Sequence, residues 1–267
     1  MTNRNRKTQE LIKPIVRVGN SAGVILPREW LNGKVRVELV ERPLDIKQDI
    51  LEILEDYLEE VIGIYIVGSY ARGEQTKDSD VDVLVITNKK RKIICMGKYN
   101  IIMTTKEVVE EEMKNNILPL LPMIKEARAV MNADLVKKWK ETKLTKKNLR
   151  LHIELTKSAL KVNRKAIDLD KEWPSNCGDA VAYSLVLRLR GIYLVDCMRK
   201  NKGWSTNGLK TLIKKITGSL KAYEGYLRVK NNGKRREELP VEEAEKLYAY
   251  DLKKIREQEK WLKERKS

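Results

Sequence analysis

Two aspartates and a glycine–serine pair in the first third of the chain have a spacing that suits phosphate and metal chemistry. Gly68 and Ser69 follow an apolar run that ends at Val67, and Asp80 and Asp82 open the next apolar run. Alternate residues of a strand point to the same face, so the two carboxylates are expected to lie side by side. They repel each other unless a cation offsets their charge, and Mg²⁺ or Mn²⁺ accepts carboxylate oxygens. The pattern therefore predicts a divalent metal site.

The glycine–serine pair is suited to phosphate. Glycine at 68 lets backbone N–H groups approach a phosphate without a side chain in the way. Residues 70–74 are expected to open a helix whose positive end faces that place, and Arg72 can pair with phosphate as a charged fork. A cation bound by Asp80 and Asp82 could bridge to a triphosphate, which is the arrangement of metal-dependent phosphoryl and nucleotidyl transfer.

The elements that must position these residues follow from hydrophobic periodicity. Residues 64–67 and 81–86 are expected to be strands, the second with Val81, Val83 and Val85 on one face and the aspartates on the other. A helix is expected over 45–61, with an apolar stripe that packs on this sheet. Two further strands, 92–96 and 99–104, are expected to form a hairpin around Gly97.

Gly-Ser, about ten residues, then Asp-x-Asp is the signature of the DNA polymerase beta-like nucleotidyltransferase superfamily. The stretch GSYARGEQTKDSDVDVLV is similar to the minimal nucleotidyltransferases of prokaryotes. The resemblance implies that Asp80 and Asp82 are catalytic and hold Mg²⁺ or Mn²⁺. It implies nucleotide binding by Gly68, Ser69, Arg72 and Ser79. The donor would be an NTP, with ATP favoured, and the acceptor a hydroxyl on a protein or an RNA.

In that superfamily a third carboxylate from a later strand completes the metal site. The position that aligns with it here is Asn100, a neutral isostere that coordinates weakly and cannot act as a general base. Glu107 or the glutamates at 110–112 on the next helix are the alternative ligands, and a solvated helix face is the simpler interpretation of them. Membership of the superfamily is therefore better supported than activity.

The N-terminal segment alternates apolar and polar residues with strand character over 15–18, 24–26 and 35–40. Three short strands hold too little core to stand alone, so an intertwined homodimer is expected. The run VGNSAGVILPREWL resembles the swapped-hairpin DNA-binding domains of the AbrB/SpoVT class. This resemblance implies duplex DNA as a partner, with Arg17 and Arg28 as contacts; two exposed surface charges are the alternative.

The remainder of the chain is expected to be helical. Its helix order and the LVLRLRG of 185–191 resemble HEPN-type or kanamycin-nucleotidyltransferase-like helical domains. HEPN ribonucleases carry Arg, four to six residues, then His, whereas the one histidine here, His152, has no such arginine, so ribonuclease activity is not expected. Arg188 and Arg190 lie on an otherwise apolar helix, where burial requires a partner. Asp179 and Asp196 are the expected partners, with a phosphate as the alternative for Arg188.

Charge is distributed unevenly along the 267 residues, whose formal net charge is +17. Residues 1–43 carry 9 basic and 4 acidic side chains, residues 44–134 carry 12 and 17, and residues 135–267 carry 34 and 17. Basic flanks favour a polyanionic partner such as nucleic acid. A solvated, heat-tolerant surface explains the same composition equally well.

Cysteine usage and hydropathy indicate the compartment. The three cysteines, Cys95, Cys177 and Cys197, lie in mostly apolar runs and are expected to be small buried hydrophobic residues in a reducing compartment. No apolar run approaches the length of a membrane span and no signal peptide is visible, so a cytoplasmic protein without a membrane partner is expected.

Together these patterns predict an α+β chain of three parts. They are an AbrB-like β segment (1–43), a nucleotidyltransferase α/β sheet domain (44–117) and a helical bundle (118–267). The function predicted first is metal-dependent transfer of NMP from an NTP to a hydroxyl, fused to a DNA-binding segment. The alternative is a catalytically weakened nucleotidyltransferase-fold DNA-binding regulator or antitoxin. A third hypothesis, modification of a small molecule such as an aminoglycoside, fits poorly with the excess of positive charge in the bundle.

Overall fold

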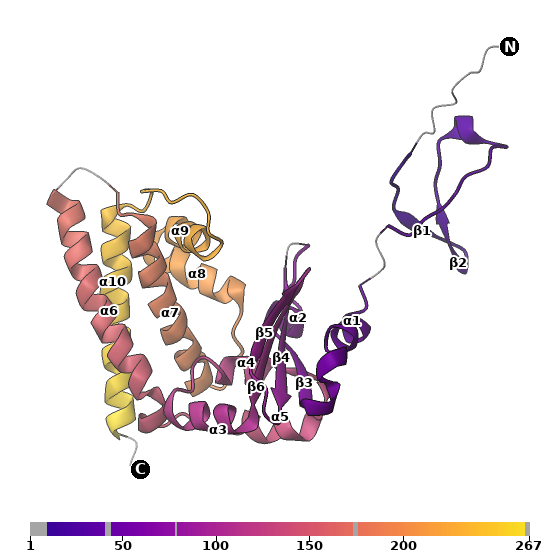
Figure 1. Ribbon diagram of the computed structural model, residues 1–267. Helices are drawn as coiled ribbons and strands as arrows, with labels where there is room; N and C mark the ends of the chain where they lie inside the picture. The colour runs from indigo at the N-terminus through magenta and orange to yellow at the C-terminus, as the bar shows by residue number, and fades with distance from the viewer. Residues whose placement is uncertain (1–9, 41–43, 78, 173–175, 265–267) are drawn as a thin grey trace. The chain divides into compact units, whose positions relative to one another are not determined.

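The computed structural model describes residues 10–40, 44–77, 79–172 and 176–264. The chain divides into two compact units, Met1–Leu44 and Asp45–Ser267. The first contains a two-stranded sheet, and the second contains a five-stranded sheet and most of the helices (Figure 1). A small β segment, a central mixed sheet and C-terminal helices confirm the predicted α+β class.

The first unit is a small hairpin whose apolar side chains face solvent. β1 (Ile15–Val18) and β2 (Ser21–Val24) pair antiparallel, and the short 3₁₀ turn η1 (Arg28–Trp30) follows. The strand predicted over 35–40 does not form, because the described residues offer that segment no strand edge to hydrogen-bond with. No described residue of this unit is buried.

The helix predicted over 45–61 is three elements in the structure. They are α1 (Ile46–Ile53), the 3₁₀ helix η2 (Glu55–Glu60) and the first residue of β3 (Val61–Val67). η2 carries four acidic residues where a longer helix would have its C-terminal end, and the helix dipole disfavours negative charge there. Val61 pairs with Thr87 in the sheet instead. The prediction of one continuous helix was therefore wrong.

The central sheet has the strand order β5-β6-β4-β3-β7. Its strands besides β3 are β4 (Val81–Thr87), β5 (Lys92–Met96), β6 (Tyr99–Thr105) and β7 (Arg128–Met131). β4 runs parallel to β6, and the other neighbouring pairs are antiparallel. β5 and β6 form the predicted hairpin, in which Gly97 has a φ of +55°.

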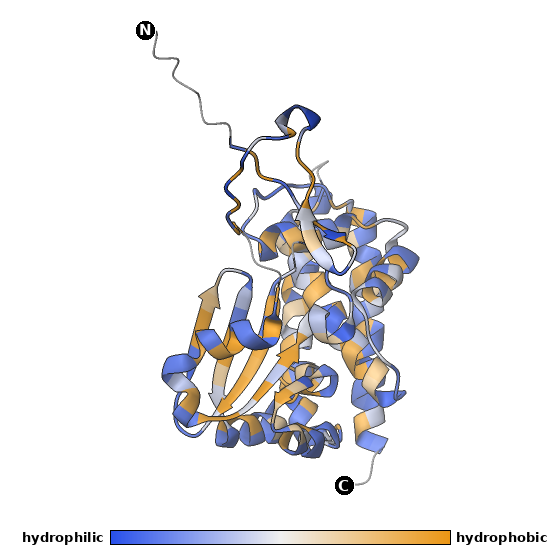
Figure 2. Cartoon of the chain, turned by 90° about the vertical axis from the view of Figure 1, so that its right-hand side faces the viewer, coloured by the Kyte–Doolittle hydropathy of each residue, from blue (hydrophilic) through white to orange (hydrophobic). Residues whose placement is uncertain are grey.

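Both faces of β4 are buried, as its alternating pattern predicts. Val81, Val83 and Val85 pack in a core with Ile50 of α1. Leu84 and Ile86 belong to a larger core that continues into the helices. Figure 2 shows strands of this sheet coloured largely as hydrophobic. The start of β4, where Asp82 lies, is thereby fixed by packing on two sides.

The segment after β6 is more structured than the sequence indicates. α3 (Lys106–Asn115) and α4 (Leu121–Glu126) precede β7 in the chain and α5 (Ala133–Lys140) follows it, and β7 pairs with β3 at the sheet edge. The prediction that everything after the prolines is helical was therefore wrong for 128–131. Pro122 lies in the first turn of α4, where its missing N–H costs nothing.

The rest of the second unit is helical (Figure 1). Its helices are α6 (Lys146–Glu172), α7 (Asp179–Arg199), α8 (Thr206–Thr217), α9 (Lys221–Lys230) and α10 (Val241–Glu264). α7 packs on α6, α9 and α10 and contributes ten buried residues, as its apolar composition predicts. Among the described residues no helix is both long and apolar enough to cross a membrane.

The partners predicted for the arginines of α7 were wrong. Asp179 accepts two hydrogen bonds from Arg228, both of 2.8 Å, and Asp196 contacts Arg199 at 3.6 Å. The charge of Arg188 instead acts on Asp251, a fully buried carboxyl whose pKa is raised by burial although the arginine charge opposes the shift. Helical periodicity predicts on which face of its helix a residue lies. It does not predict which acidic residue of a neighbouring helix will lie next to it.

The cysteines follow the sequence expectation only in part. Cys177 and Cys197 are buried, and burial raises the pKa of the Cys177 thiol to about 12. Cys95 is exposed on the edge strand β5, which contradicts the prediction that it is buried. An edge strand has a neighbour on one side only, so an apolar run there need not be covered.

His152 is packed between α7 and α10. Its Nε2 lies 3.2 Å from Oε1 of Gln258, and its ring lies against Gly191, where an added Cβ would be 3.0 Å from the ring. The amide of Gln258 donates to the Ile192 carbonyl and to Asp196. The amide oxygen of Gln258 therefore accepts a hydrogen bond from His152, whose Nε2 carries the donated proton.

This setting predicts a histidine that stays neutral in mild acid. Burial lowers the pKa of His152 to about 4, with the nearby Arg188 charge adding to the effect. As the pH falls, the unfolded chain takes up a proton on this histidine before the folded chain does. The free energy of unfolding therefore decreases below about pH 6.5, by at most about 3 kcal/mol near pH 4. As the chain has a single histidine, an NMR titration of its ring protons measures the pKa directly. A midpoint near 6.5 would contradict the burial.

Candidate active site

Gly68 forms the turn between β3 and α2 (Gly68–Arg72) and lies against the second aspartate. Its φ is +70°, a left-handed conformation that favours glycine. A Cβ at this position would lie 2.5 Å from Oδ2 of Asp82. The turn is thus in direct contact with the Asp82 carboxylate, and any side chain at position 68 would displace Asp82.

Asp82 is the second residue of β4 and is half-buried, whereas Asp80 precedes the strand and is exposed. Burial raises the pKa of Asp82, and the charge of Asp80 adds to the rise. A hydrogen bond from Asn100 and the charges of Lys230 and Arg72 act in the opposite direction. The structure therefore brings the two predicted metal ligands close enough for their charges to interact.

Asn100 lies directly beside Asp82. The parallel register of β4 and β6 pairs the two residues, and Nδ2 of Asn100 donates to Oδ1 of Asp82 at 3.2 Å. The oxygen of the same amide faces the Cys95 thiol at 3.7 Å. An amide here supports the charged form of Asp82, whereas a carboxylate would add a third negative charge.

Glu126, at the end of α4, is the central contact of the turn. Its Oε1 accepts the backbone N–H of Gly68 at 2.7 Å, and its Oε2 accepts from Arg72 at 2.6 Å and from the indole of Trp204 at 3.1 Å. Only 8% of its side chain is exposed. Three donors from distant parts of the chain thus meet at one nearly buried carboxylate.

Arg72 is held by two acids. It donates to Glu126 and, at 2.9 Å, to Glu74. Burial alone would lower the pKa of Arg72, but these two hydrogen-bonded carboxylates raise it. Glu74 also accepts the backbone N–H of Thr206 at the start of α8. Arg72 therefore links the turn to the helical part, and its Nη2 makes no hydrogen bond with any described residue.

The two serines have different surroundings. The hydroxyl of Ser69 is half-buried and makes no hydrogen bond with any described residue. Oγ of Ser79 accepts the backbone N–H of Thr76 at 2.8 Å and lies 3.1 Å from the Thr76 hydroxyl, which closes the loop before β4. Ser69 is thus free to meet a ligand, and Ser79 shapes the loop that leads to Asp80.

The comparisons with known proteins place these residues in a family. The family model for the Nucleotidyltransferase domain matches residues 47–182, which is half of the chain. A curated protein of Methanocaldococcus jannaschii, named "Putative protein adenylyltransferase MJ0141", is 38% identical over 79 residues, which are 26% of this chain and 77% of that protein. The chain belongs to the nucleotidyltransferase family.

Two solved structures resemble the nucleotidyltransferase more distantly. A nucleotidyltransferase-like protein of Exiguobacterium sibiricum has a TM-score of 0.38 at 14% identity, over 80% of this chain and 76% of the other. The spectinomycin adenyltransferase AAD(9) of Enterococcus faecialis, solved with ATP and spectinomycin, has a TM-score of 0.39 at 15% identity, over 78% and 97%.

Family membership supports transfer of a nucleoside monophosphate from a nucleotide. Sequence reasoning for this nucleotidyltransferase missed Glu126, Trp204 and Lys230. Glu126 ends an amphipathic stretch after two prolines, and Lys230 is one of many lysines. No local signal in the sequence connects either residue with Gly68 or Asp82, because the connection is made by packing.

A cavity of about 700 Å³ adjoins the turn of the nucleotidyltransferase. Arg72, Glu126 and Trp204 line it together with the end of α7, the segment between α5 and α6, and Trp261 of α10. Its wall also carries three exposed lysines that form no ion pair with a described residue: Lys125, Lys143 and Lys202. The cavity therefore has aromatic and cationic walls.

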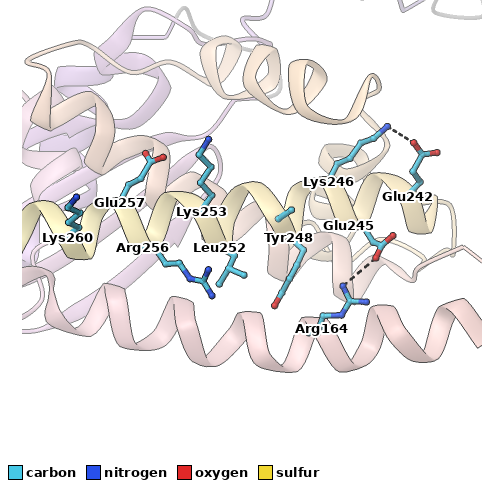
Figure 3. A pocket seen from close by; sticks show the side chains of 11 residues that line it. Arg164, Glu242, Glu245, Lys246, Tyr248, Leu252, Lys253, Arg256, Glu257 and Lys260 are labelled. Carbon is cyan, nitrogen blue, oxygen red and sulfur yellow. Dashed lines mark hydrogen bonds and ion pairs between the residues drawn. The ribbon is translucent and has the colours of Figure 1, made fainter.

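A second, larger hollow of about 830 Å³ is lined by α10 and by Arg164 of α6 (Figure 3). It shares no residue with the cavity beside Gly68. Four of its charged side chains pair with one another, in Arg164–Glu245 and Lys246–Glu242. This groove is a surface of the helical part and not the candidate active site.

We expect Glu126→Gln to loosen the turn. Glutamine has the same size but no charge for Arg72, and its amide nitrogen cannot accept from Gly68 or Trp204. The free energy of unfolding should fall by about 2–3 kcal/mol, and the amides of 68–74 should exchange faster with deuterium. Urea unfolding and hydrogen exchange measure both effects.

The matched control for this variant is Glu141→Gln. Glu141 lines the same cavity but is exposed and makes no ion pair with a described residue. If both variants show wild-type exchange in the turn, Glu126 does not hold it.

Proposed function

We propose that this nucleotidyltransferase transfers NMP from an NTP to a hydroxyl acceptor at the site formed by Gly68, Ser69, Asp80 and Asp82. The observation that carries the proposal is the contact between Gly68 and Asp82, in which a Cβ would lie 2.5 Å from the carboxylate. The predicted phosphate-binding turn and the predicted metal ligand thereby form one site and not two.

The reaction is a displacement at the α-phosphorus of the nucleotide. The acceptor hydroxyl oxygen forms a bond to that phosphorus, and the bond to the β-phosphate oxygen breaks. Pyrophosphate leaves with the electron pair, and the hydroxyl proton is released to solvent. Little covalent chemistry is left for the protein, so its contribution is to position the reactants and to stabilise charge.

The donor set suits a hard divalent cation. Asp80 and Asp82 supply carboxylate oxygens, the pKa of Asp82 is raised by burial, and no group of three His, Cys, Asp or Glu side chains that could hold a metal occurs among the described residues. Mg²⁺ is commonly bound through one or two carboxylates together with waters and substrate phosphates. Bound by these two aspartates, Mg²⁺ or Mn²⁺ would offset charge on the phosphates.

Positive side chains around Asp80 and Asp82 would also offset negative charge on the phosphates. Lys230 and Arg72 act electrostatically on Asp82. Arg72 is fixed through Nε and Nη1, so its Nη2 can reach a phosphate without breaking either ion pair. The unengaged hydroxyl of Ser69 supplies a further hydrogen-bond donor, while Ser79 acts by shaping the loop.

We propose ATP as the donor, because the M. jannaschii relative is named a protein adenylyltransferase. The acceptor is a hydroxyl on a protein or at an RNA end, bound in the cavity beside the turn. The three free lysines, Lys125, Lys143 and Lys202, favour an acceptor that carries negative charge and disfavour a cationic small molecule.

Incubation with α-labelled ATP and Mn²⁺ tests the proposal. Label should pass to the chain itself, to a protein or to RNA, and Asp80→Asn or Asp82→Asn should lower the rate at least about 100-fold, since each removes charge at the reacting phosphate. The control is Asp134→Asn, an exposed aspartate on α5. Equal labelling by all variants, or none by the wild type on any acceptor, would contradict the assignment.

The second candidate function is that of a DNA-binding regulator or antitoxin in which the nucleotidyltransferase part binds nucleotide with weak turnover. It is favoured by the first unit, where no described residue is buried and Val37 and Val40 are each 72% exposed. Such a hairpin needs a second chain to cover it, so this unit is proposed to form a homodimer. Arg17 and Arg28 are exposed and form no ion pair with a described residue.

Arg17→Ala combined with Arg28→Ala in the full chain tests this role. Binding to duplex DNA should weaken, and the slope of log affinity against log salt should become shallower by about two per chain. Fluorescence anisotropy over a range of salt concentrations measures both. The control is Lys47→Ala, an exposed cation of α1. An unchanged affinity and slope would rule out these arginines as the DNA contacts.

A further inference from the structure

α6 carries apolar side chains on two opposite faces. One face is buried against the other helices and includes Leu149, Ile153, Leu160 and Ile167. The other face carries large apolar residues that are exposed: Leu151 at 37%, Leu155 at 50%, Val162 at 65% and Leu169 at 61%. A helix that packs on a core through one face has no need of the second stripe.

The exposed apolar residues lie along one line of the helix. They are separated by four, seven and seven positions, which fits the seam of a two-stranded coiled coil with the polar Ser158 and Lys165 at the intervening positions, toward one flank. Arg164, labelled in Figure 3, reaches from α6 to Glu245 on α10, and the stripe lies about half a helical turn from it. In Figure 1 α6 lies at the outer edge of the helical part.

One flank of the stripe carries charges in a definite order. From the start of the helix the exposed residues on this flank are Lys147, Arg150, Glu154, Lys161, Lys165, Asp168 and Glu172. The opposite flank carries Ala159, Ala166 and the half-buried Asp170. Basic residues near the start of the helix and acidic residues near its end thus lie together on the first flank.

This order is self-complementary when two copies of α6 run antiparallel. About a two-fold axis near residues 159 and 160, Lys147 lies opposite Glu172 of the second copy. Arg150, which contacts Glu154 of its own helix at 2.8 Å, lies opposite Asp168, which contacts Arg164 of its own helix. Glu154 then meets Lys165 across the same axis, and Leu151 meets Leu169. The midpoints of these four pairs all fall between residues 159 and 160, so one two-fold axis brings each pair together within about one residue.

Parallel pairing does not give this match. In a parallel pair each flank faces the opposite flank of the partner, which here carries alanines and a single acid, Asp170, and no base that could receive Glu154, Asp168 or Glu172. Lys161 lies close to the axis and therefore near Lys161 of the second copy. This is a contact between like charges, at a position exposed to solvent. The charge pattern therefore favours the antiparallel arrangement.

We propose that a second copy of this chain covers the stripe, forming an antiparallel two-fold dimer through α6. The interface is isologous, because the same residues meet in both directions. It is formed by the second unit alone and is separate from pairing of the N-terminal hairpins. The apolar stripe supplies burial, and the three charge pairs, each occurring twice, set direction and register.

Leu155→Glu combined with Val162→Glu, made in the full chain, tests the surface. Both side chains are at least half exposed, so the monomer should fold as before, which circular dichroism checks. In sedimentation equilibrium the mass of the variant should be half that of the wild type. The control is Ile93→Glu, an apolar residue of β5 that is 68% exposed.

Two results would overturn the proposal. They are a wild type that sediments at the single-chain mass of 31.0 kDa, and a folded double variant whose mass equals that of the wild type. Loss of the dimer in Ile93→Glu as well would show that the effect is not specific to α6, and this too would overturn it. If the N-terminal hairpins pair with a third copy, the wild type is larger than a dimer and the variant still falls to half its mass.

Charge reversal tests the direction of pairing. Glu154→Lys should raise the dimer dissociation constant about tenfold, because two pairs become repulsive, and adding Lys165→Glu should restore it. Sedimentation or fluorescence cross-correlation measures the constants. If the second substitution does not restore the dimer, the antiparallel register is wrong.

Discussion

The arrangement around the glycine–serine turn depends on one nearly buried carboxylate. Glu126 receives hydrogen bonds from the Gly68 backbone, the Arg72 guanidinium and the Trp204 indole. A carboxylate removed from water is costly unless it is paired, so the three donors must stay together for the charge to be tolerated. The conformation of the turn therefore depends on the helical part as well as on the sheet.

The acid pair is the second electrostatic constraint. Packing on both faces of β4 fixes Asp82 beside Gly68 and Asn100, and burial raises its pKa. The amide at 100 and the cations at 72 and 230 offset part of that cost. A site with two acids, one amide and flanking cations carries less negative charge than one with three acids, so a bound cation and a polyphosphate balance it more easily.

Two surfaces carry apolar side chains that the described parts of the chain do not cover. One is the N-terminal hairpin, in which no described residue is buried, and the other is the outer stripe of α6. Each exposed apolar Å² withholds about 25 cal/mol of stabilisation that burial would give. Both surfaces are accounted for if the chain works as an assembly, and they lie in different units, so the two contacts can form independently.

The sequence by itself determined β4, because this strand alternates between two buried faces and the period is a local property of 81–86. It also determined the β5–β6 hairpin, since a short connection leaves few registers open. The resemblance to the superfamily aligned Asn100 with the third ligand, and the structure places Asn100 beside Asp82. The α+β class is confirmed, and the roles of Asp80 and Asp82 stay predictions. The sequence did not reveal that 55–60 leave the α-helix or that 128–131 join the sheet.

The tertiary structure alone decided which distant side chains meet. Glu126, Trp204 and Lys230 come from three separate elements, and their proximity to Gly68 or Asp82 depends on how the helices pack on the sheet. The same holds for Arg228 as the partner of Asp179, where sequence reasoning chose the arginines of the same helix. Periodicity gives the face on which a residue lies, whereas a hydrogen-bond partner depends on contacts between elements far apart in the chain, which no local pattern records.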